Sequence, residues 1–267
     1  MAKLSILGAG GWALGLAILL NNNGHDVTVW SKVKAELDGI REEGENKKSL
    51  PGVKIPKEIK LCEDLKTVVA DADIVVMAVA SPFVRSTAKE VASLGINNIQ
   101  MVNVAKGIEE DSLMTMTAII REEIPDVRIA ILSGPSHAEE VSRGIPTTCV
   151  IGADSKEYAE YLQNIFMSEV FRVYISPDVL GIELGGSLKN VIALAAGIAD
   201  GLGYGDNTKA ALITRGIHEI ARLGVAMGGK LQTFYGLSGM GDLIVTCASM
   251  HSRNRRAGIL MGQVAPE

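Results

Sequence analysis

The hydrophobic pattern of the first half of the chain alternates between short apolar runs and longer amphipathic stretches. The apolar runs predict strands at residues 3–7, 26–30, 73–79, 99–104 and 128–132. Apolar positions at helical spacing predict intervening helices at residues 12–23, 83–94 and 113–123. Uniformly apolar strands that alternate with helices are typical of a parallel sheet buried on both faces.

The pattern changes near Pro177. Before it, two more strands at 148–151 and 170–175 flank a helix at 158–166; after it, helices at 179–201 and 208–223 lead into further loops and helices. We therefore expect an α/β protein with an N-terminal Rossmann-type, doubly wound sheet over residues 1–176. An all-α domain follows over residues 177–267.

Composition and charge narrow the class of protein. Apolar residues make up 47% and charged residues 21%, as in globular domains, and a formal net charge of −5 argues against a nucleic-acid partner. The three cysteines, Cys62, Cys149 and Cys247, lack metal-site spacing, so we expect no metal and a reducing compartment. Without a signal-peptide pattern or an apolar run of about 18 residues, we expect a cytoplasmic protein that is not inserted in a membrane.

A glycine-rich turn joins the first predicted strand to the first helix. Gly8, Gly10 and Ala13 fit the spacing GxGxxG/A, in which glycines permit a tight turn and close approach of a pyrophosphate to the helix N-terminus. An ordinary strand-to-helix turn is the alternative. The flanking strands favour a dinucleotide cofactor, NADPH or NADH.

The residues after the second strand bear on the choice of cofactor. Ser31, Lys32 and Lys34 stand where an acid would hold the ribose of NADH, and the first acid is Glu36. A hydroxyl and two amines favour NADPH over NADH. The alternative is a helix start whose lysines are simply solvated.

Polar residues also follow two later strands. Lys106 comes after the strand ending at Val104, and the Gly134-Pro135-Ser136 turn comes after the strand ending at Leu132. Ligands of doubly wound sheets bind at this carboxyl edge, so both loops are candidates for substrate contacts. Solvated loops are the alternative.

The apolar helix at 179–201 contains one lysine beside an asparagine. Desolvation of Lys189 lowers the pKa of its ammonium, so Lys189 could exchange a proton with a carbonyl oxygen. Asp242 could orient it, or could simply cap a helix. Downstream, Ser252 and Asn254 stand among the arginines 253, 255 and 256, a donor set suited to a phosphate dianion.

Together these segments resemble the bacterial NAD(P)-dependent glycerol-3-phosphate dehydrogenases. The resemblance spans nearly the whole chain in order, through Gly8–Trp12, Leu132–Val141, Gly186–Val191, Gly239–Leu243 and His251–Arg255. It implies reversible reduction of dihydroxyacetone phosphate to sn-glycerol 3-phosphate for glycerophospholipid synthesis.

The resemblance also implies roles for individual residues. Lys189 is the implied proton acceptor in the oxidative direction, with Lys106 and Asp242 beside it. The cofactor is expected at Gly8, Gly10, Gly11, Trp12, Ser31, Lys32, Lys106, Ala138 and Arg253. The substrate is expected at Lys106, Gly134, Ser136, Lys189, Asp242, Ser252, Arg253 and Asn254.

Some positions depart from the family pattern. Gly11 stands where serine is usual, Ala13 where glycine is usual, and Ser31 where arginine is common, which weakens the preference for NADP. The family continues past Glu267 through further helices that bring a glutamate towards the cofactor. We therefore expect the helical domain of this chain to be incomplete.

Two other functions remain open at this point. A related dehydrogenase acting on a β-hydroxyacid would need a carboxylate clamp in place of a phosphate site. A nucleotide-binding sensor without catalysis would need the glycine loop alone, whereas this chain also has Lys106, Lys189, Asp242 and Arg253. A homodimer is also open, because the glycine- and alanine-rich helix from Val179 could pack against a partner or within the chain.

Overall fold

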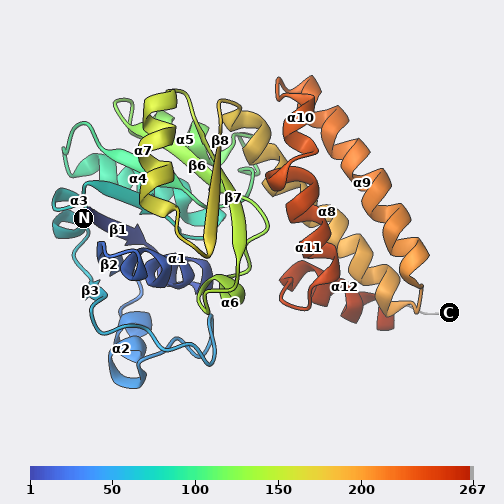
Figure 1. The fold of residues 1–267 in the computed structure, drawn as a ribbon, viewed down its shortest axis with the longest axis horizontal. Coiled ribbons are helices and arrows are strands. Elements are labelled where there is room, and N and C mark those ends of the chain that lie inside the picture. The colour runs from blue at the N-terminus through green and yellow to red at the C-terminus, as the bar shows by residue number, and fades with distance from the viewer. Residues whose placement is uncertain (265–267) are drawn as a thin grey trace. The chain divides into compact units, whose positions relative to one another are not determined.

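The computed structural model describes residues 1–264 and divides into two compact units (Figure 1). The first comprises residues 1–132, 137–147 and 151–177. The second comprises residues 133–136, 148–150 and the chain from Asp178 onward. The second unit thus includes Gly134 and Ser136, which precede the boundary we placed near Pro177. The expectation about the chain's ending at Glu267 falls on residues outside the described part.

One eight-stranded sheet runs through the first half of the chain in the order β3-β2-β1-β4-β5-β6-β7-β8. The pairings from β3 through β6 are parallel, with Leu4 of β1 opposite Val27 of β2 and Ile74 of β4. The prediction of a parallel, doubly wound sheet is confirmed. The strands are β1 (Lys3–Leu7), β2 (Asp26–Trp30), β3 (Lys60–Cys62), β4 (Ile74–Met77), β5 (Gln100–Asn103), β6 (Arg128–Ser133), β7 (Thr147–Ala153) and β8 (Phe171–Ser176).

Helices cover both faces of this sheet. Alternate strand residues such as Val75 and Met77 join a core with α3, α4 and α5, while Val76 between them is equally buried and faces the other way. On that other side α1 packs against β2 and α7. The helices of the first unit are α1 (Gly11–Asn22), α2 (Lys34–Glu43), α3 (Leu65–Ala70), α4 (Val84–Ser93), α5 (Met116–Glu123), α6 (Ala138–Val141) and α7 (Lys156–Phe166).

The second unit is built around one long helix. Asp178 begins it as the N-cap, accepting hydrogen bonds from the backbone nitrogens of Gly181 at 3.0 Å and Lys230 at 2.8 Å. The central helix is α8 (Val179–Gly201), and the others are α9 (Asp206–Ala226), α10 (Leu231–Phe234), α11 (Asp242–Ala248) and α12 (Arg253–Gln263). A π-helical turn at Leu237–Gly241 leads directly into α11.

Glycines let α8 and α12 pack backbone to backbone. A Cβ on Gly197 would overlap the carbonyl of Arg255, and one on Gly258 would overlap the carbonyl of Leu194. Gly201 and Gly262, one turn further along their helices, make the same kind of approach. The small residues of α8 therefore have a partner within the chain.

Helix α8 is also long and apolar enough, by length and composition, to cross a membrane. However, 56% of its most apolar window is buried inside the protein. Its central lysine is buried and ion-paired to another helix, as described below. These contacts are those of a core helix.

Four elements lie where the hydrophobic pattern predicted no helix or strand, although a helix start near Lys34 was one alternative for the residues after β2. Helices α2, α3 and α6 and strand β3 are short or largely polar, and β3 has three residues at the edge of the sheet. Such segments carry too few apolar positions to show a period. Strand β3 forms through a tertiary contact, since Lys60 to Cys62 pair in register with Thr28 to Trp30 of β2.

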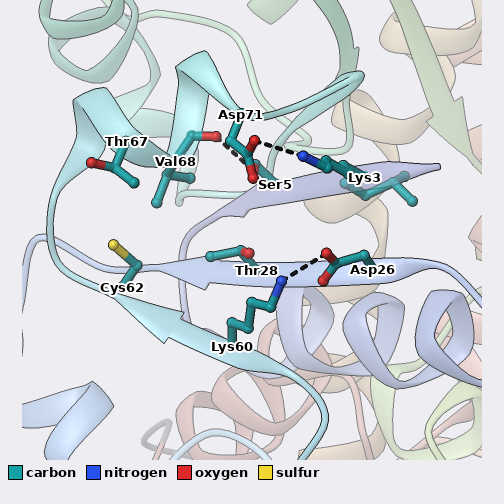
Figure 2. A pocket seen from close by; sticks show the side chains of 10 residues that line it. Lys3, Ser5, Asp26, Thr28, Lys60, Cys62, Thr67, Val68 and Asp71 are labelled. Atoms are coloured by element: carbon teal, nitrogen blue, oxygen red, sulfur yellow. Dashed lines mark hydrogen bonds and ion pairs between the residues drawn. The ribbon is translucent and has the colours of Figure 1, made fainter.

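A hollow near the amino ends of β1, β2 and β3 is lined by the residues of two surface ion pairs (Figure 2). Lys3 Nζ lies 2.7 Å from Asp71 Oδ1, and Lys60 Nζ lies 2.7 Å from Asp26 Oδ2. In the same hollow the Ser5 hydroxyl donates to the Val68 carbonyl at 2.7 Å. This is the opposite end of the strands from the carboxyl edge, where doubly wound sheets bind their ligands.

Candidate active site

The glycine loop follows β1 at the carboxyl edge of the sheet. Gly8 has a φ of +127°, and a Cβ there would lie 2.8 Å from the Ala78 carbonyl oxygen, so its glycine is required by the turn itself. Helix α1 then begins at Gly11, with Gly10 as its N-cap and no acidic residue in its first turn. Its N-terminal amide groups can therefore meet an anion without repulsion from an acid in that turn.

At Gly10, neither the backbone conformation nor the neighbouring atoms require a glycine. Its φ is −72°, which any residue can adopt, and a Cβ placed there has no atom within 4 Å. The fold itself therefore does not require a glycine at this position. A ligand whose phosphates approach the backbone closely would require it, so this cradle fits a dinucleotide.

We therefore expect Gly10→Ala to keep the stability of the fold and to weaken dinucleotide binding. The Michaelis constants for NADH and NADPH should each rise by about tenfold or more, because the methyl group occupies the space needed by the pyrophosphate. Thermal unfolding and dinucleotide titrations of the same preparation measure the two effects. An unchanged affinity would show that the cofactor does not approach Gly10.

Asn46 holds a second segment against the glycine loop. The Asn46 side chain is buried and donates to the Ala9 carbonyl at 3.0 Å, while its Oδ1 accepts from the Ser49 amide at 3.0 Å. A Cβ on Gly11 would lie 2.5 Å from the Ser49 carbonyl oxygen, so the usual serine of the family would displace this turn. Sequence reasoning missed Asn46, because nothing in the local pattern links it to a loop 37 residues away.

Two further predicted cofactor residues lie beside the loop. The Trp12 indole nitrogen is buried and has no hydrogen-bond partner among residues 1–264, which leaves a donor suited to a ligand. Ala138 begins α6, and a Cβ on Gly11 would lie 3.7 Å from the Ala138 Cβ. Ser31 is buried directly after β2, whereas Lys32 is exposed and ion-paired to Glu90.

Lys106 follows β5, at the same edge of the sheet. The buried Asn103 side chain folds back on this loop, donating to the Ala105 carbonyl and accepting from the Ala105 amide, each at 3.0 Å. Lys106 comes next and is half-buried. The local structure thus fixes the backbone immediately before the lysine.

In the second unit, Lys189 and Asp242 form a buried ion pair. Lys189 Nζ lies 2.5 Å from Asp242 Oδ1, and the two side chains are 8% and 3% exposed. Thr246, which the sequence analysis missed, accepts from Lys189 Nζ at 2.5 Å and donates to the Asp242 carbonyl at 2.6 Å. The carboxylate of Asp242 thus contacts the ammonium directly and compensates the loss of water around it.

The backbone around this pair is closely packed. Asp242 is the first residue of α11, immediately after the π-helical turn, a feature that is frequent at functional sites. A Cβ on Gly185, one turn before Lys189, would lie 2.9 Å from the Ser238 carbonyl oxygen in that turn. Thr246 lies one turn after Asp242 on the same face of α11, which is the signal that could have identified it.

The 133–136 segment adjoins the same turn. A Cβ on Gly241 would lie 3.7 Å from the Pro135 ring, and the Ser136 hydroxyl donates to the Gly134 carbonyl at 3.1 Å. Gly134 has a φ of +147° and faces the backbone of Thr148 and Cys149. The structure thus brings the predicted loop next to the residue that precedes Asp242.

The basic cluster divides into different roles. Ser252 is the N-cap of α12 and accepts from the Arg255 amide at 3.2 Å, while Arg253 and Asn254 occupy its first turn. Arg255 instead pairs with Asp200, with its two nitrogens 2.8 and 2.7 Å from Asp200 Oδ2. Our grouping of Arg255 with phosphate-binding guanidiniums was therefore wrong, because Asp200, a partly buried acid at the end of α8, already pairs with its guanidinium.

Asp200 makes the stability of this part of the fold depend on pH. Burial opposes ionisation, but hydrogen bonds from Lys209 and Arg255 outweigh it and hold the pKa of Asp200 below its usual value. A carboxyl with a lowered pKa in the folded state stabilises the fold above its unfolded pKa, and this contribution is lost as pH falls through the folded pKa.

We therefore expect Asp200→Asn to destabilise the protein more at neutral pH than in acid. Denaturant unfolding of both proteins between pH 7 and pH 3 measures the difference. The gap in unfolding free energy should narrow below about pH 4. A gap that stays constant across this range would contradict the assignment.

A doubly wound parallel sheet with a glycine-loop cradle, followed by a helical unit with a buried lysine–aspartate pair, defines a dinucleotide-dependent dehydrogenase. Among residues 1–264 no three His, Cys, Asp or Glu side chains gather into a metal-binding group. The donor set that is present fits a dinucleotide and an anionic substrate.

Comparisons with known proteins identify the family. Residues 3–159 match the family described as NAD-dependent glycerol-3-phosphate dehydrogenase N-terminus, and residues 178–266 match its C-terminus. The chain belongs to the NAD(P)-dependent glycerol-3-phosphate dehydrogenases.

Individual relatives agree with this assignment. Glycerol-3-phosphate dehydrogenase [NAD(P)+] of Fusobacterium nucleatum is 61% identical over 265 residues, covering 98% of this chain and 79% of the relative. The enzyme of the same name from Agathobacter rectalis is 56% identical over 263 residues, covering 98% and 78%. A crystal structure of glycerol-3-phosphate dehydrogenase from Coxiella burnetii superposes with a TM-score of 0.95 at 35% identity, covering 99% of this chain and 81% of that one.

Proposed function

We propose that this protein reduces dihydroxyacetone phosphate to sn-glycerol 3-phosphate with NADH or NADPH, and catalyses the reverse reaction. The observation that carries the proposal is the buried contact of Lys189 Nζ with Asp242 and Thr246, each at 2.5 Å. A lysine fixed in this way can exchange a proton with a substrate oxygen. The bound dinucleotide supplies the hydride.

Different residues bind the cofactor, transfer the proton and bind the substrate phosphate. Gly10, Gly11 and Trp12 hold the dinucleotide together with Ser31, Lys32 and Ala138, and Lys106 contacts both cofactor and substrate, as the family resemblance implies. Lys189 donates a proton to the carbonyl oxygen during reduction and accepts one during oxidation, while Asp242 and Thr246 keep its ammonium oriented. The substrate phosphate is bound by Arg253 and Asn254 at the start of α12, where the helix dipole also favours an anion. Ser252 supports this site by capping the helix, and Gly134 and Ser136 line the substrate from the adjoining loop.

The direct test follows absorbance at the nicotinamide band. Dihydroxyacetone phosphate added to the protein with NADH or NADPH should consume the cofactor, and glycerol 3-phosphate should compete with it. A β-hydroxyacid should neither compete nor react, since the donor set is suited to a phosphate. Binding of the dinucleotide without consumption would contradict the proposal and would favour a sensor.

The cellular setting follows from the same proposal. A product that forms the backbone of glycerophospholipids supports a role in lipid synthesis. The free thiols of Cys149 and Cys247, both buried, support a reducing, cytoplasmic location.

A further inference from the structure

A carboxylate lies at the end of β2, next to the residue that follows the strand. The Ser31 hydroxyl donates to Glu36 Oε2 at 2.7 Å and accepts from the Val33 amide at 3.1 Å. Ser31 is 5% exposed, and Glu36 is half-buried in the first turn of α2. The turn thus brings an acid that is five residues away in sequence back to the strand end.

This position has a defined chemistry in doubly wound sheets. The end of the second strand meets the adenosine ribose, where a carboxylate accepts a hydrogen bond from the free 2′-hydroxyl and repels a 2′-phosphate. In the sequence, Glu36 is the first acid after the second strand, and the Ser31 hydroxyl with the amines of Lys32 and Lys34 favoured NADPH. In the structure, the carboxylate of Glu36 lies next to the end of β2, held there by the Ser31 hydroxyl.

The neighbouring cation already has a different partner. Lys32 is ion-paired to Glu90 of α4, and both side chains are exposed, at 69% and 39%. An exposed pair of this kind is weak, so Lys32 can exchange Glu90 for a phosphate at little cost. Lys32 and Glu36 therefore act in opposite directions on a 2′-phosphate, and the acid is the one held in place by a buried hydroxyl.

We propose that Glu36, positioned by Ser31, is the residue that discriminates against the 2′-phosphate and shifts this enzyme towards NADH. The inference rests on the proposed function, in which the glycine loop of the same unit holds the pyrophosphate. It goes beyond that function by assigning cofactor choice to one side chain. Ser31 acts through Glu36 and is a positioning residue.

The experiment compares NADPH with NADH in four variants, by the dissociation constant from calorimetric titration of the protein without substrate and by kcat/KM; the NADPH/NADH ratio below refers to affinity and to kcat/KM alike. Glu36→Gln keeps an acceptor for the Ser31 hydroxyl and removes the charge, so it should raise the NADPH/NADH ratio by about tenfold. Ser31→Ala frees the carboxylate and should move the ratio in the same direction by a smaller factor. Glu42→Gln, at an exposed position on the same helix, makes the same change in net charge and should leave the ratio unchanged. Lys32→Ala should lower the ratio.

The outcomes separate this inference from the proposed function. A ratio that Glu36→Gln leaves unchanged, while Gly10→Ala still weakens binding of both dinucleotides, would overturn the role of Glu36 and leave the cofactor site in place. If Gly10→Ala also has no effect, the cofactor site itself is wrong. An equal shift from Glu42→Gln would attribute the effect to net charge and would also overturn the inference.

Discussion

Replacing Lys189 with alanine should lower kcat/KM for dihydroxyacetone phosphate by about 10³-fold, because the reaction loses its positioned proton donor. Dinucleotide affinity should change by less than about twofold, since the dinucleotide is held by the glycine loop and the first turn of α1 in the proposed function. Steady-state kinetics and calorimetric titration with NADH measure the two quantities. Turnover at the unaltered rate would contradict the role given to Lys189.

A control must separate chemistry from folding. Removal of Lys189 leaves the buried Asp242 without its partner, which costs about 3–5 kcal/mol of stability. The double variant Lys189→Met with Asp242→Asn removes both charges and should fold more stably than Lys189→Ala, yet remain inactive. Thr246→Val keeps the ion pair and loses one hydrogen bond to the ammonium, so its loss of activity should be the smaller one.

Gly197→Ala should destabilise the helical unit by about 3 kcal/mol, since the new methyl group meets the backbone of Arg255, which cannot rotate away as a side chain would. Helix α12 would shift, and with it the first turn that carries Arg253 and Asn254. We therefore expect a higher KM for dihydroxyacetone phosphate and a lower melting temperature. Circular dichroism and steady-state kinetics measure both.

Gly39→Ala is the matched control for this substitution. Gly39 lies inside helix α2, and a Cβ there has no atom within 4 Å. The same chemical change at Gly39 should therefore raise the free energy of unfolding by about 0.5–1 kcal/mol through helix propensity. It should leave the KM for dihydroxyacetone phosphate unchanged. Similar effects at the two positions would contradict the close crossing of α8 and α12.

The strength of local periodicity decided which elements could be predicted. The limits of α8 were predicted residue for residue, and those of α1 within one residue at each end, because both helices are predominantly apolar. Helix α2 has a polar sequence with buried positions at Leu37 and Ile40, too few to show a period. Strand β3 becomes a strand through pairing with β2 rather than through its own residues.

The same limit applies to the site. The pairing of Lys189 with Asp242 could be inferred because a buried ammonium needs a nearby carboxylate, and Asp242 stood in a turn suited to supply one. Physical chemistry does not single out Asn46 or Glu36 in the same way, since each acts through a contact that exists only after folding, whereas Thr246 could have been inferred from its place one turn after Asp242. Arg255 was wrongly grouped with the phosphate-binding residues because its partner, Asp200, lies 55 residues earlier, and the local sequence does not show that the two side chains meet.

The division of the chain into its two units has a consequence for how the protein melts. The backbone passes from one unit to the other five times, at 132/133, 136/137, 147/148, 150/151 and 177/178. No single cut yields two intact pieces, and a fragment starting at Asp178 would lack residues 133–136 and 148–150 of its own unit. Heat should therefore unfold both units in one calorimetric transition, because unfolding of either unit disrupts chain segments that belong to the other.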